Sequence, residues 1–215
     1  PAQTRSIFSH MGWNRVVGFH TRNAPHRAHE YIQLAAMEQA SADGLLISPV
    51  IGPKKPGDFE ADAVLGAYQA VLSAGIYPKG RAVLAAFATW SRYAGPREAV
   101  FTALCRRNMG CSHFILGRDH TGVGDFYSPD ANQRMFGDLG DIGIEPLFFD
   151  EIAFDSAKGS FGPAREIADP AAISGTEVRE RLRAGRNLPA WFMRTEAQQA
   201  LFEMIGRGES VFHTV

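Results

Sequence analysis

The sequence is poor in cysteine, in net charge and in long apolar runs, and each shortage excludes a class of protein. The two cysteines, Cys105 and Cys111, are too few for a disulfide framework and lack the spacing of zinc ligands. We therefore expect free thiols and a reducing compartment, the cytoplasm. The formal net charge of −1 excludes a general polyanion-binding surface, so nucleic acid is not an expected partner.

Segments that would enter a membrane are also missing from the sequence. No apolar run is long enough to span a bilayer and no signal peptide is present, so we expect no membrane contact. Hydrophobic residues make up 45% of the 215 residues and charged residues 21%, which is usual for a globular protein of one large or two small domains. Because the chain starts at Pro1 rather than at a methionine, we interpret it as a fragment or a processed form.

Short apolar runs alternate with segments of helical periodicity over most of the chain. Glycines that stop helices follow two of these segments, and Pro96 suits a first helical turn. A β-α-β-α order predicts an α/β fold with a Rossmann-like parallel sheet covered by helices on both faces. The expected strands are residues 15–19, 44–51, 81–87, 112–116 and 144–149, and the expected helices are residues 28–40, 61–74 and 96–109.

The last quarter of the chain lacks this alternation. Residues 154–171 are rich in glycine, proline, alanine and serine, and we expect a loop there. Ser174 and Glu177 have the spacing of a capping box that starts a helix, and residues 195–205 form a last helix. We therefore predict an α/β nucleotidyltransferase domain over residues 1–172 and a small C-terminal helical subdomain over residues 173–215.

The stretch His20-Thr21-Arg22-Asn23-Ala24-Pro25-His26-Arg27-Ala28-His29 joins the first expected strand to the first expected helix. Backbone N–H groups at a helix start are unpaired and the helix dipole is positive there, so an anion such as phosphate or sulfate is favoured. His26 and His29 are three residues apart and share one face of the first turn. Alone, such a pair is more often a surface feature than a ligand pair, and it gains weight here because Arg22 and Asn23 precede it.

A second motif, Gly117-Arg118-Asp119-His120, directly follows the expected strand 112–116. Gly117 permits close approach of a ligand to the backbone, and Arg118 can bind a phosphate through its forked guanidinium. Asp119 is suited to ribose or adenine, or to fixing Arg118, and His120 adds an imidazole. Both motifs lie at carboxyl ends of strands, where open α/β sheets bind their ligands.

Together these motifs resemble those of the ATP sulfurylase (sulfate adenylyltransferase) family, in the same order and over nearly the whole chain. The resemblance is to the catalytic domain without the β-rich N-terminal domain that usually precedes it. The matching segments are Arg22-Asn23 with the histidine pair, Gly52 with Lys55, Gly57 and Asp58, residues 92–99, residues 117–120, and residues 173–176 with Arg179.

The resemblance implies a reaction in which sulfate and MgATP give adenylyl sulfate and pyrophosphate, by in-line attack and without a covalent enzyme intermediate. Positioning and charge stabilisation then supply most of the catalysis. Mg²⁺ enters with ATP, and we assign it no protein ligands. The family also implies a homo-oligomer, and it leaves open a fusion to, or cooperation with, an adenylyl-sulfate kinase domain.

Carried over residue by residue, the resemblance assigns catalysis to one group of side chains and substrate binding to a larger one. Sulfate would bind Arg22, and the phosphates and departing pyrophosphate would bind neighbouring polar groups. The catalytic group is Arg22, Asn23, His26, His29 and Arg118. The groups that would contact ATP or the acceptor are His20, Thr21, Arg22, Asn23, His26, His29, Gly117, Arg118, Asp119, His120 and the backbone N–H of Thr121.

Two residues depart from the family pattern on the acceptor side: His20 stands in place of a glutamine and Thr121 in place of an alanine. With an unperturbed pKa of about 6.5, His20 would change charge near physiological pH. Three hypotheses stay open. The chain is an active ATP sulfurylase that tolerates His20, or a nucleotidyltransferase for a different oxyanion or phosphorylated acceptor, or a non-catalytic nucleotide-binding module of a larger protein.

Other polar residues have simpler interpretations. His113 lies inside an apolar strand and is expected to pack in the core. Arg97 and Glu98 are expected to pair with each other or to lie at a subunit contact. Lys54 and Lys55 are expected in a solvated loop rather than in a phosphate clamp.

Overall fold

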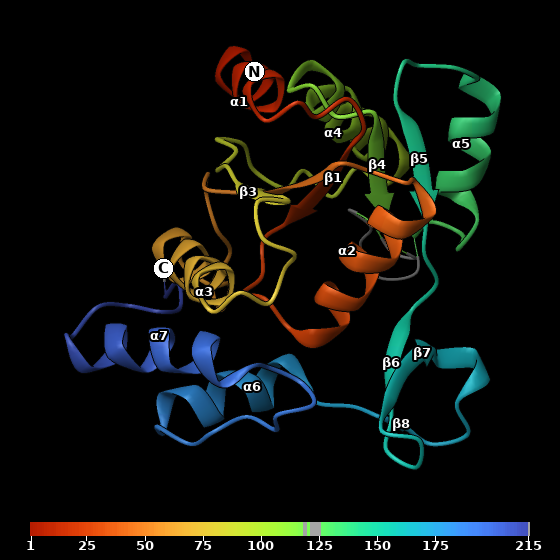
Figure 1. Ribbon diagram of the computed structural model, residues 1–215. Helices are drawn as coiled ribbons and strands as arrows, with labels where there is room; N and C mark the ends of the chain where they lie inside the picture. The colour runs from red at the N-terminus through yellow and green to blue at the C-terminus, as the bar shows by residue number, and fades with distance from the viewer. Residues whose placement is uncertain (118–119, 121–125, 215) are drawn as a thin grey trace.

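The computed structural model describes residues 1–117, 120 and 126–214, and its centre is a five-stranded sheet in the order β3-β2-β1-β4-β5 (Figure 1). Every neighbouring pair in this sheet is parallel. The Rossmann-like parallel sheet predicted from the sequence is therefore confirmed. Its strands are β1 Val16–Thr21, β2 Gly44–Pro49, β3 Ala82–Leu84, β4 His113–Leu116 and β5 Glu145–Phe148.

The strand order reverses at β1. Strands β2 and β3 lie on one side of it and β4 and β5 on the other, with Val17 paired to His113 and Gly18 to Phe114. Chain segments that leave the carboxyl ends of β1 and β4 therefore separate, and such a reversal leaves a crevice at that edge of the sheet.

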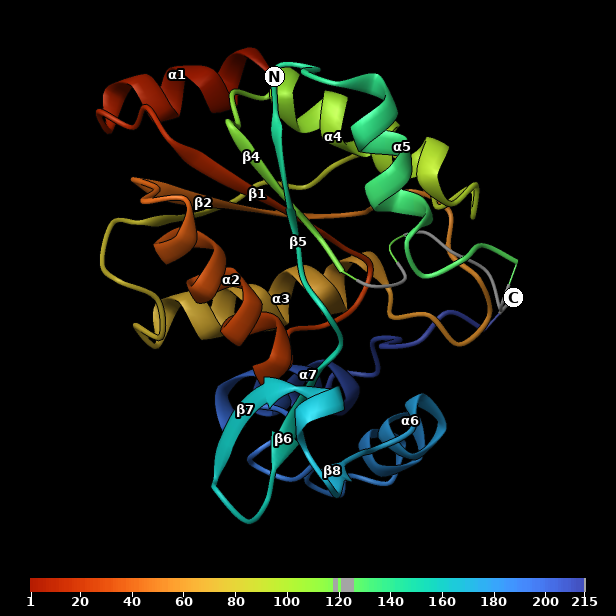
Figure 2. The same cartoon turned by 90° about the vertical axis from the view of Figure 1, so that its right-hand side faces the viewer.

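Helices cover both faces of the sheet (Figure 2). In that view α1, α4 and α5 lie above the strands and α2 and α3 below them, and each layer has its own cluster of buried apolar residues. Because both faces are covered, all six residues of β2 are buried. The helices of these layers are α1 Ala2–His10, α2 Arg27–Gln39, α3 Ala61–Ser73, α4 Pro96–Asn108 and α5 Ala131–Leu139.

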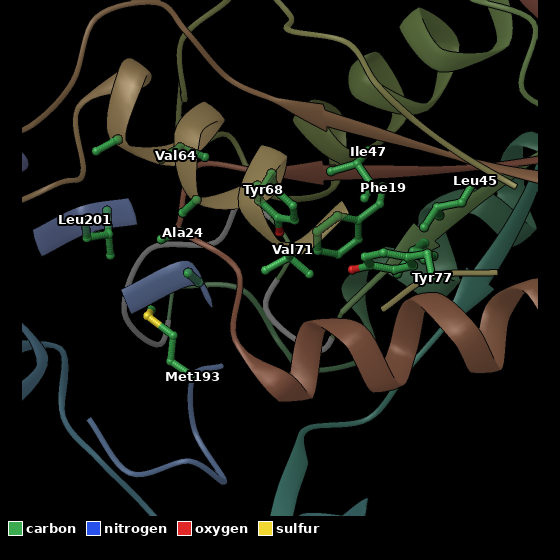
Figure 3. Close-up of a cluster of buried hydrophobic side chains, with 14 of the residues drawn as sticks. Phe19, Ala24, Leu45, Ile47, Val64, Tyr68, Val71, Tyr77, Met193 and Leu201 are labelled. Carbon is green, nitrogen blue, oxygen red and sulfur yellow. The ribbon is translucent and has the colours of Figure 1, made fainter. Parts of the chain in front are cut away.

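The larger of the two apolar clusters lies between the sheet and α3 (Figure 3). Phe19 of β1 and Ile47 of β2 meet Tyr68 and Val71 of α3 in this cluster, and all four are buried. Removal of this apolar surface from water stabilises the contact between helix and sheet. The core thereby holds β1 in register immediately before the His20 to His29 stretch.

The C-terminal helices α6 Gly175–Arg183 and α7 Thr195–Gly206 pack into the same apolar cluster, through residues such as Leu182 and Leu201. The hydroxyl oxygen of Ser174 accepts the backbone N–H of Glu177 at 3.1 Å, which confirms the predicted helix start. The Glu177 carboxylate binds Arg181 at 2.8 Å instead of closing the capping box. A separate subdomain over residues 173–215 stays a prediction.

The expected loop over residues 154–171 is wrong. Strands β6 Ile152–Asp155, β7 Ser160–Pro163 and β8 Pro170–Ala171 form a small antiparallel sheet there, with the 3₁₀ turn η1 Ala164–Glu166 between the last two. Phe154 and Phe161 are paired across β6 and β7 with 5.2 Å between ring centroids, and such cross-strand aromatic pairs stabilise short strands. No periodic pattern predicted these strands, because their aromatic residues are isolated within a glycine-rich stretch.

Helices α1 and α5 were not predicted from the sequence, and both cover the face of the sheet that carries α4. Among the described residues, no helix is both long enough and apolar enough to cross a membrane. His113 is 5% exposed, and its Nε2 lies 3.2 Å from the Glu145 carboxylate, so the expected packed position is confirmed.

Candidate active site

A cavity of about 290 Å³ lies where the carboxyl ends of β1 and β4 separate. Both sequence motifs contribute to its wall, although they are far apart along the chain. The helix α2 adds His29 and Ile32, and the segment before α4 adds Ser91 and Tyr93. The remaining lining residues are Phe19, His20, Thr21, Arg22, Asn23, Ile115, Gly117 and His120.

Of the predicted site residues that the structure describes, His26 is not part of this wall. Arg118, Asp119 and Thr121 lie outside the described residues. His26 lines a second cavity of about 330 Å³, together with aromatic residues that include Trp191. Its ring nevertheless stacks on His29, with 3.5 Å between the ring centroids, so the predicted histidine pair is in contact.

The start of α2 differs from the simple anion site expected from sequence. The N–H of Arg27 donates to the carbonyl of Phe192 at 2.8 Å, and the N–H of His29 donates to the carbonyl of His26 at 2.9 Å. The Nδ1 atom of His26, the N-cap residue, also lies within hydrogen-bond reach of the His29 N–H. The expectation that the N–H groups at the helix start stand unpaired is therefore wrong for Arg27 and His29.

A tight turn places the first two polar side chains of the site. The Thr21 hydroxyl oxygen accepts the N–H of Asn23 at 3.1 Å, and Thr21 itself is buried. This side chain-to-backbone bond is the kind that threonine forms in turns. It directs the chain away from β1 so that Arg22 and Asn23 reach the cavity wall.

Burial favours the neutral form of both members of the histidine pair. Burial lowers the pKa of His26 to about 4 and holds the pKa of His29 well below its ordinary value. The Nδ1 atom of His29 is sealed from solvent and has no hydrogen-bond partner in the part of the chain that the structure describes. Each neutral ring offers one N–H donor, and a bound anion would favour the protonated form and raise both pKa values.

His20 is also neutral, and the expected change of charge near physiological pH is wrong. Burial and the charges of Arg106 and Arg22, with a contribution from the neighbouring His120, hold its pKa well below the ordinary value. The Nη2 atom of Arg106 lies 2.8 Å from Nδ1 of His20. Sequence reasoning missed Arg106, because nothing in an isolated helix pattern indicates that a basic residue points inward.

His120 closes the cavity on the β4 side. Its ring packs edge-on against Phe114, with 5.4 Å between centroids, and its Nε2 lies 3.3 Å from the hydroxyl of Thr102. Burial, with help from the positive charge of Arg106, lowers the pKa of His120 to about 3. The interior of the site therefore carries neutral imidazoles.

Positive charge gathers at the rim of the cavity instead, around Tyr93. Arg22 donates a hydrogen bond to the Tyr93 hydroxyl, and the Nζ atom of Lys55 lies 3.3 Å from the centroid of the Tyr93 ring. Lys54 is half-buried, and its Nζ donates to the carbonyl of Val50 at 2.6 Å. The expectation of a solvated loop is wrong for Lys54, which with Arg22 and Lys55 lines an adjoining cavity of about 160 Å³.

A buried carboxylate holds the segment that carries Tyr93. Glu98 is 3% exposed, and it accepts the N–H of Arg92 at 2.8 Å and the N–H of Ala94 at 3.1 Å. Tyr93 has a φ of +56°, a left-handed conformation that a tyrosine adopts only when its surroundings enforce it. The expected Arg97–Glu98 pair or subunit contact is therefore wrong for Glu98, which stabilises this turn.

The described wall of the main cavity contains no carboxylate, and the described residues include no cluster of three or more histidine, cysteine, aspartate or glutamate side chains suited to a metal ion.

The strand order, which reverses at β1, defines a doubly wound α/β domain, and solved structures share this fold. Nicotinic acid mononucleotide adenylyltransferase from Plasmodium falciparum, complexed with NaAD, aligns with a TM-score of 0.54 at 10% identity over 91% of this chain and 96% of that one. TmcAL from Thermotoga maritima, bound with alpha-thio ATP, aligns with a TM-score of 0.55 at 12% identity over 92% and 57%. At these identities the likeness shows the fold alone.

The family follows from sequence comparison. The ATP-sulfurylase family model matches residues 1–204, so the chain belongs to the ATP-sulfurylase family. The resemblance recognised from the motifs is thereby confirmed.

Its relatives are longer proteins. A sulfate adenylyltransferase from Symbiobacterium thermophilum is 47% identical over 213 residues, covering 94% of this chain and 52% of the relative. A probable bifunctional SAT/APS kinase 2 from Sorangium cellulosum is 43% identical over 94% of this chain and 36% of the relative. A hexameric APS kinase from Thiobacillus denitrificans aligns with a TM-score of 0.71 at 25% identity, over 95% of this chain and 39% of that one. The chain spans about half the length of most of the curated relatives it matches.

Proposed function

We propose that this chain transfers the adenylyl group of MgATP to sulfate. A sulfate oxygen forms a bond to the α-phosphorus, the bond between that phosphorus and the oxygen bridging to the β-phosphorus breaks, and pyrophosphate leaves with the electron pair. Family membership supports this reaction. The structural observation that carries it is the meeting of the β1 and β4 motifs in one cavity of about 290 Å³.

The chain supplies charge and hydrogen-bond donors rather than a nucleophile. Arg22 binds sulfate and the reacting phosphate, Asn23 and Thr21 face the ATP phosphates, and His29 with His26 stabilises the departing pyrophosphate. Preorganised donors aimed at developing negative charge are the largest contribution in such reactions. The roles of Arg118, Asp119 and Thr121 rest on the family resemblance alone.

The main test is pyrophosphate release from MgATP with and without sulfate, with molybdate as a second acceptor. Molybdate mimics sulfate but gives an unstable adenylyl product, so it pulls the reaction forward. Release that depends on either anion is the expected result. ATP binding without anion-dependent release would contradict sulfate as the acceptor, and absence of ATP binding would contradict nucleotidyl transfer altogether.

A different oxyanion is the second candidate acceptor, and the observation that favours it is His20 at the position of a family glutamine. If the natural acceptor is another anion, His20→Gln should improve sulfate use, with a lower KM for sulfate and an unchanged KM for MgATP. Steady-state kinetics with both substrates varied separate the two cases. Unchanged or weakened sulfate kinetics in this variant would argue for sulfate as the natural acceptor.

We also propose that the protein works as a homo-oligomer in the cytoplasm, in company with an adenylyl-sulfate kinase. Two relatives support the association, since one is named a probable bifunctional SAT/APS kinase and another a hexameric APS kinase. The free cysteines Cys105 and Cys111 agree with a reducing compartment. Light scattering of the purified chain tests the oligomer, and a monomer across the working concentration range would contradict it.

A further inference from the structure

Arg106 has the largest of the fully buried side chains among the described residues, yet it is charged. It lies on α4 with none of its surface exposed, and its stem crosses β1 at Gly18. A Cβ atom at Gly18 would lie 2.9 Å from Cγ of Arg106, so the glycine makes room for this side chain. A buried charge is costly unless it is paired, and that cost calls for an explanation.

The guanidinium group of Arg106 has an incomplete set of partners. Its Nη2 donates to Nδ1 of His20 at 2.8 Å and to the carbonyl of Ser48 at 3.2 Å, and its carbon lies 4.3 Å from the centroid of the Phe87 ring. Its Nε and Nη1 atoms have no hydrogen-bond partner in the described part of the chain. No ion pair among the described residues includes Arg106.

This contact decides which nitrogen of His20 carries the proton. A guanidinium group has donors only, so Nδ1 of His20 must accept with its lone pair. In a neutral imidazole the proton is then on Nε2. The Nε2 atom has no hydrogen-bond partner among the residues that the structure describes, and His20 lines the main cavity.

We propose that Arg106 is a positioning residue for the acceptor anion. It holds His20 in the Nε2–H form, so that a neutral ring donates one hydrogen bond to the oxyanion. Its own charge, without a carboxylate partner in the described structure, lies behind the ring and becomes the counter-charge of the bound anion. The identity of the anion rests on the proposed function, whereas the protonation of His20 does not.

Nitrogen NMR of the whole chain, labelled at its histidines, tests the first half of the proposal without any need for activity. The expected spectrum between about pH 6 and 8 shows His20 with a protonated Nε2 and a bare Nδ1, assigned by its loss in the His20→Gln variant. A protonated Nδ1, or a cationic ring, would overturn the proposal. Pyrophosphate release by the unmodified chain separately tests the proposed function.

Kinetics of Arg106 variants test the second half. Arg106→Met keeps the length of the stem but removes the donor and the charge, and we expect the KM for sulfate to rise about 10- to 100-fold, with little change in the KM for MgATP. Arg106→Lys should recover part of this loss because it keeps a donor and a charge. Arg107→Met on the same helix removes an exposed arginine and serves as the matched control.

A double-mutant cycle separates positioning from a merely structural role. The cost of Arg106→Met should shrink when His20 is already alanine, because most of the effect passes through the ring. The proposal would be contradicted if Arg106→Met raised the KM for sulfate by the same factor with histidine and with alanine at position 20. It would also be contradicted if the KM values for sulfate and MgATP rose equally. Thermal unfolding checks the fold, and we expect it to be kept, since apolar replacement of a buried ion is often neutral or stabilising.

Discussion

The interior of the candidate active site carries neutral histidines, whereas its rim carries positively charged side chains. Inside, His20, His29 and His120 have their pKa values lowered by burial and are neutral. At the rim, Arg22 and Lys55 gather around Tyr93. Under the proposed function, the rim would attract and hold the anionic substrates, while the interior would orient them with directional donors whose own charge need not change.

Removal of the rim charge should have the largest effect. We expect Arg22→Ala to lower kcat/KM for adenylyl transfer by about 100- to 1,000-fold, because Arg22 is the arginine of the described cavity wall and the proposed function assigns it to sulfate and the reacting phosphate. Thermal unfolding should be almost unchanged, since Arg22 is only partly buried. Arg134→Ala, which breaks an exposed pair with Asp130, is the control and should keep full activity. Full turnover in Arg22→Ala would show that the site is assigned wrongly.

A smaller loss of activity is expected when the segment that carries Tyr93 is displaced, with the rim charges still present. Glu98 accepts the two backbone N–H groups on different carboxylate oxygens, and Glu98→Gln replaces one of these oxygens with an NH₂ donor, so one N–H loses its acceptor and the turn at Tyr93 loosens. We expect the free energy of unfolding to fall by about 1–3 kcal/mol, with a drop in activity of about tenfold. Denaturant unfolding and kinetics measure the two effects. Glu180→Gln, an exposed carboxylate on α6, is the control, and equal behaviour of both variants would contradict a role for Glu98.

The neutral interior predicts a loss of stability in acid. The unfolded chain binds a proton at each histidine near pH 6.5, whereas the folded pKa values of His26 and His120 are about 4 and about 3. The unfolded state therefore binds more protons over this window, and the free energy of unfolding falls as the pH drops from about 6.5 to about 4, by less than about 1.4 kcal/mol per pH unit for each ring. Urea unfolding at several pH values should show the loss, and a constant midpoint down to pH 4 would mean that these rings are protonated in the folded protein.

Most of the main fold could be predicted from the sequence because its signals are local. The five strands of the parallel sheet and the helices α2, α3 and α4 follow from apolar periodicity and from glycines that stop helices. The small sheet of β6, β7 and β8 could not, since its strands are short and depend on the contact between Phe154 and Phe161. Helices α1 and α5 were missed as well, and their buried aromatic residues Phe8 and Phe136 join the apolar cluster on the α4 face of the sheet.

The candidate site likewise has residues that the sequence predicted and residues that it did not. His20, Arg22, Asn23, His29, Gly117 and His120 were recognised from their motifs, and the structure brings them to one cavity. Tyr93 and Ser91 also line it, although the local sequence pattern suggested only a helix start nearby. The match of residues 92–99 to a family segment was the one signal that could have indicated that Tyr93 lines the site.

By itself the sequence determined the alternation of the five main strands with α2, α3 and α4, the family and the two motifs at strand ends, because these depend on residues that are neighbours along the chain. Only the tertiary structure decided the protonation of the site. His20 and Arg106 are 86 positions apart in sequence but 2.8 Å apart in space. A pKa depends on burial and on every charge nearby, so it is set by distances that a linear pattern does not contain.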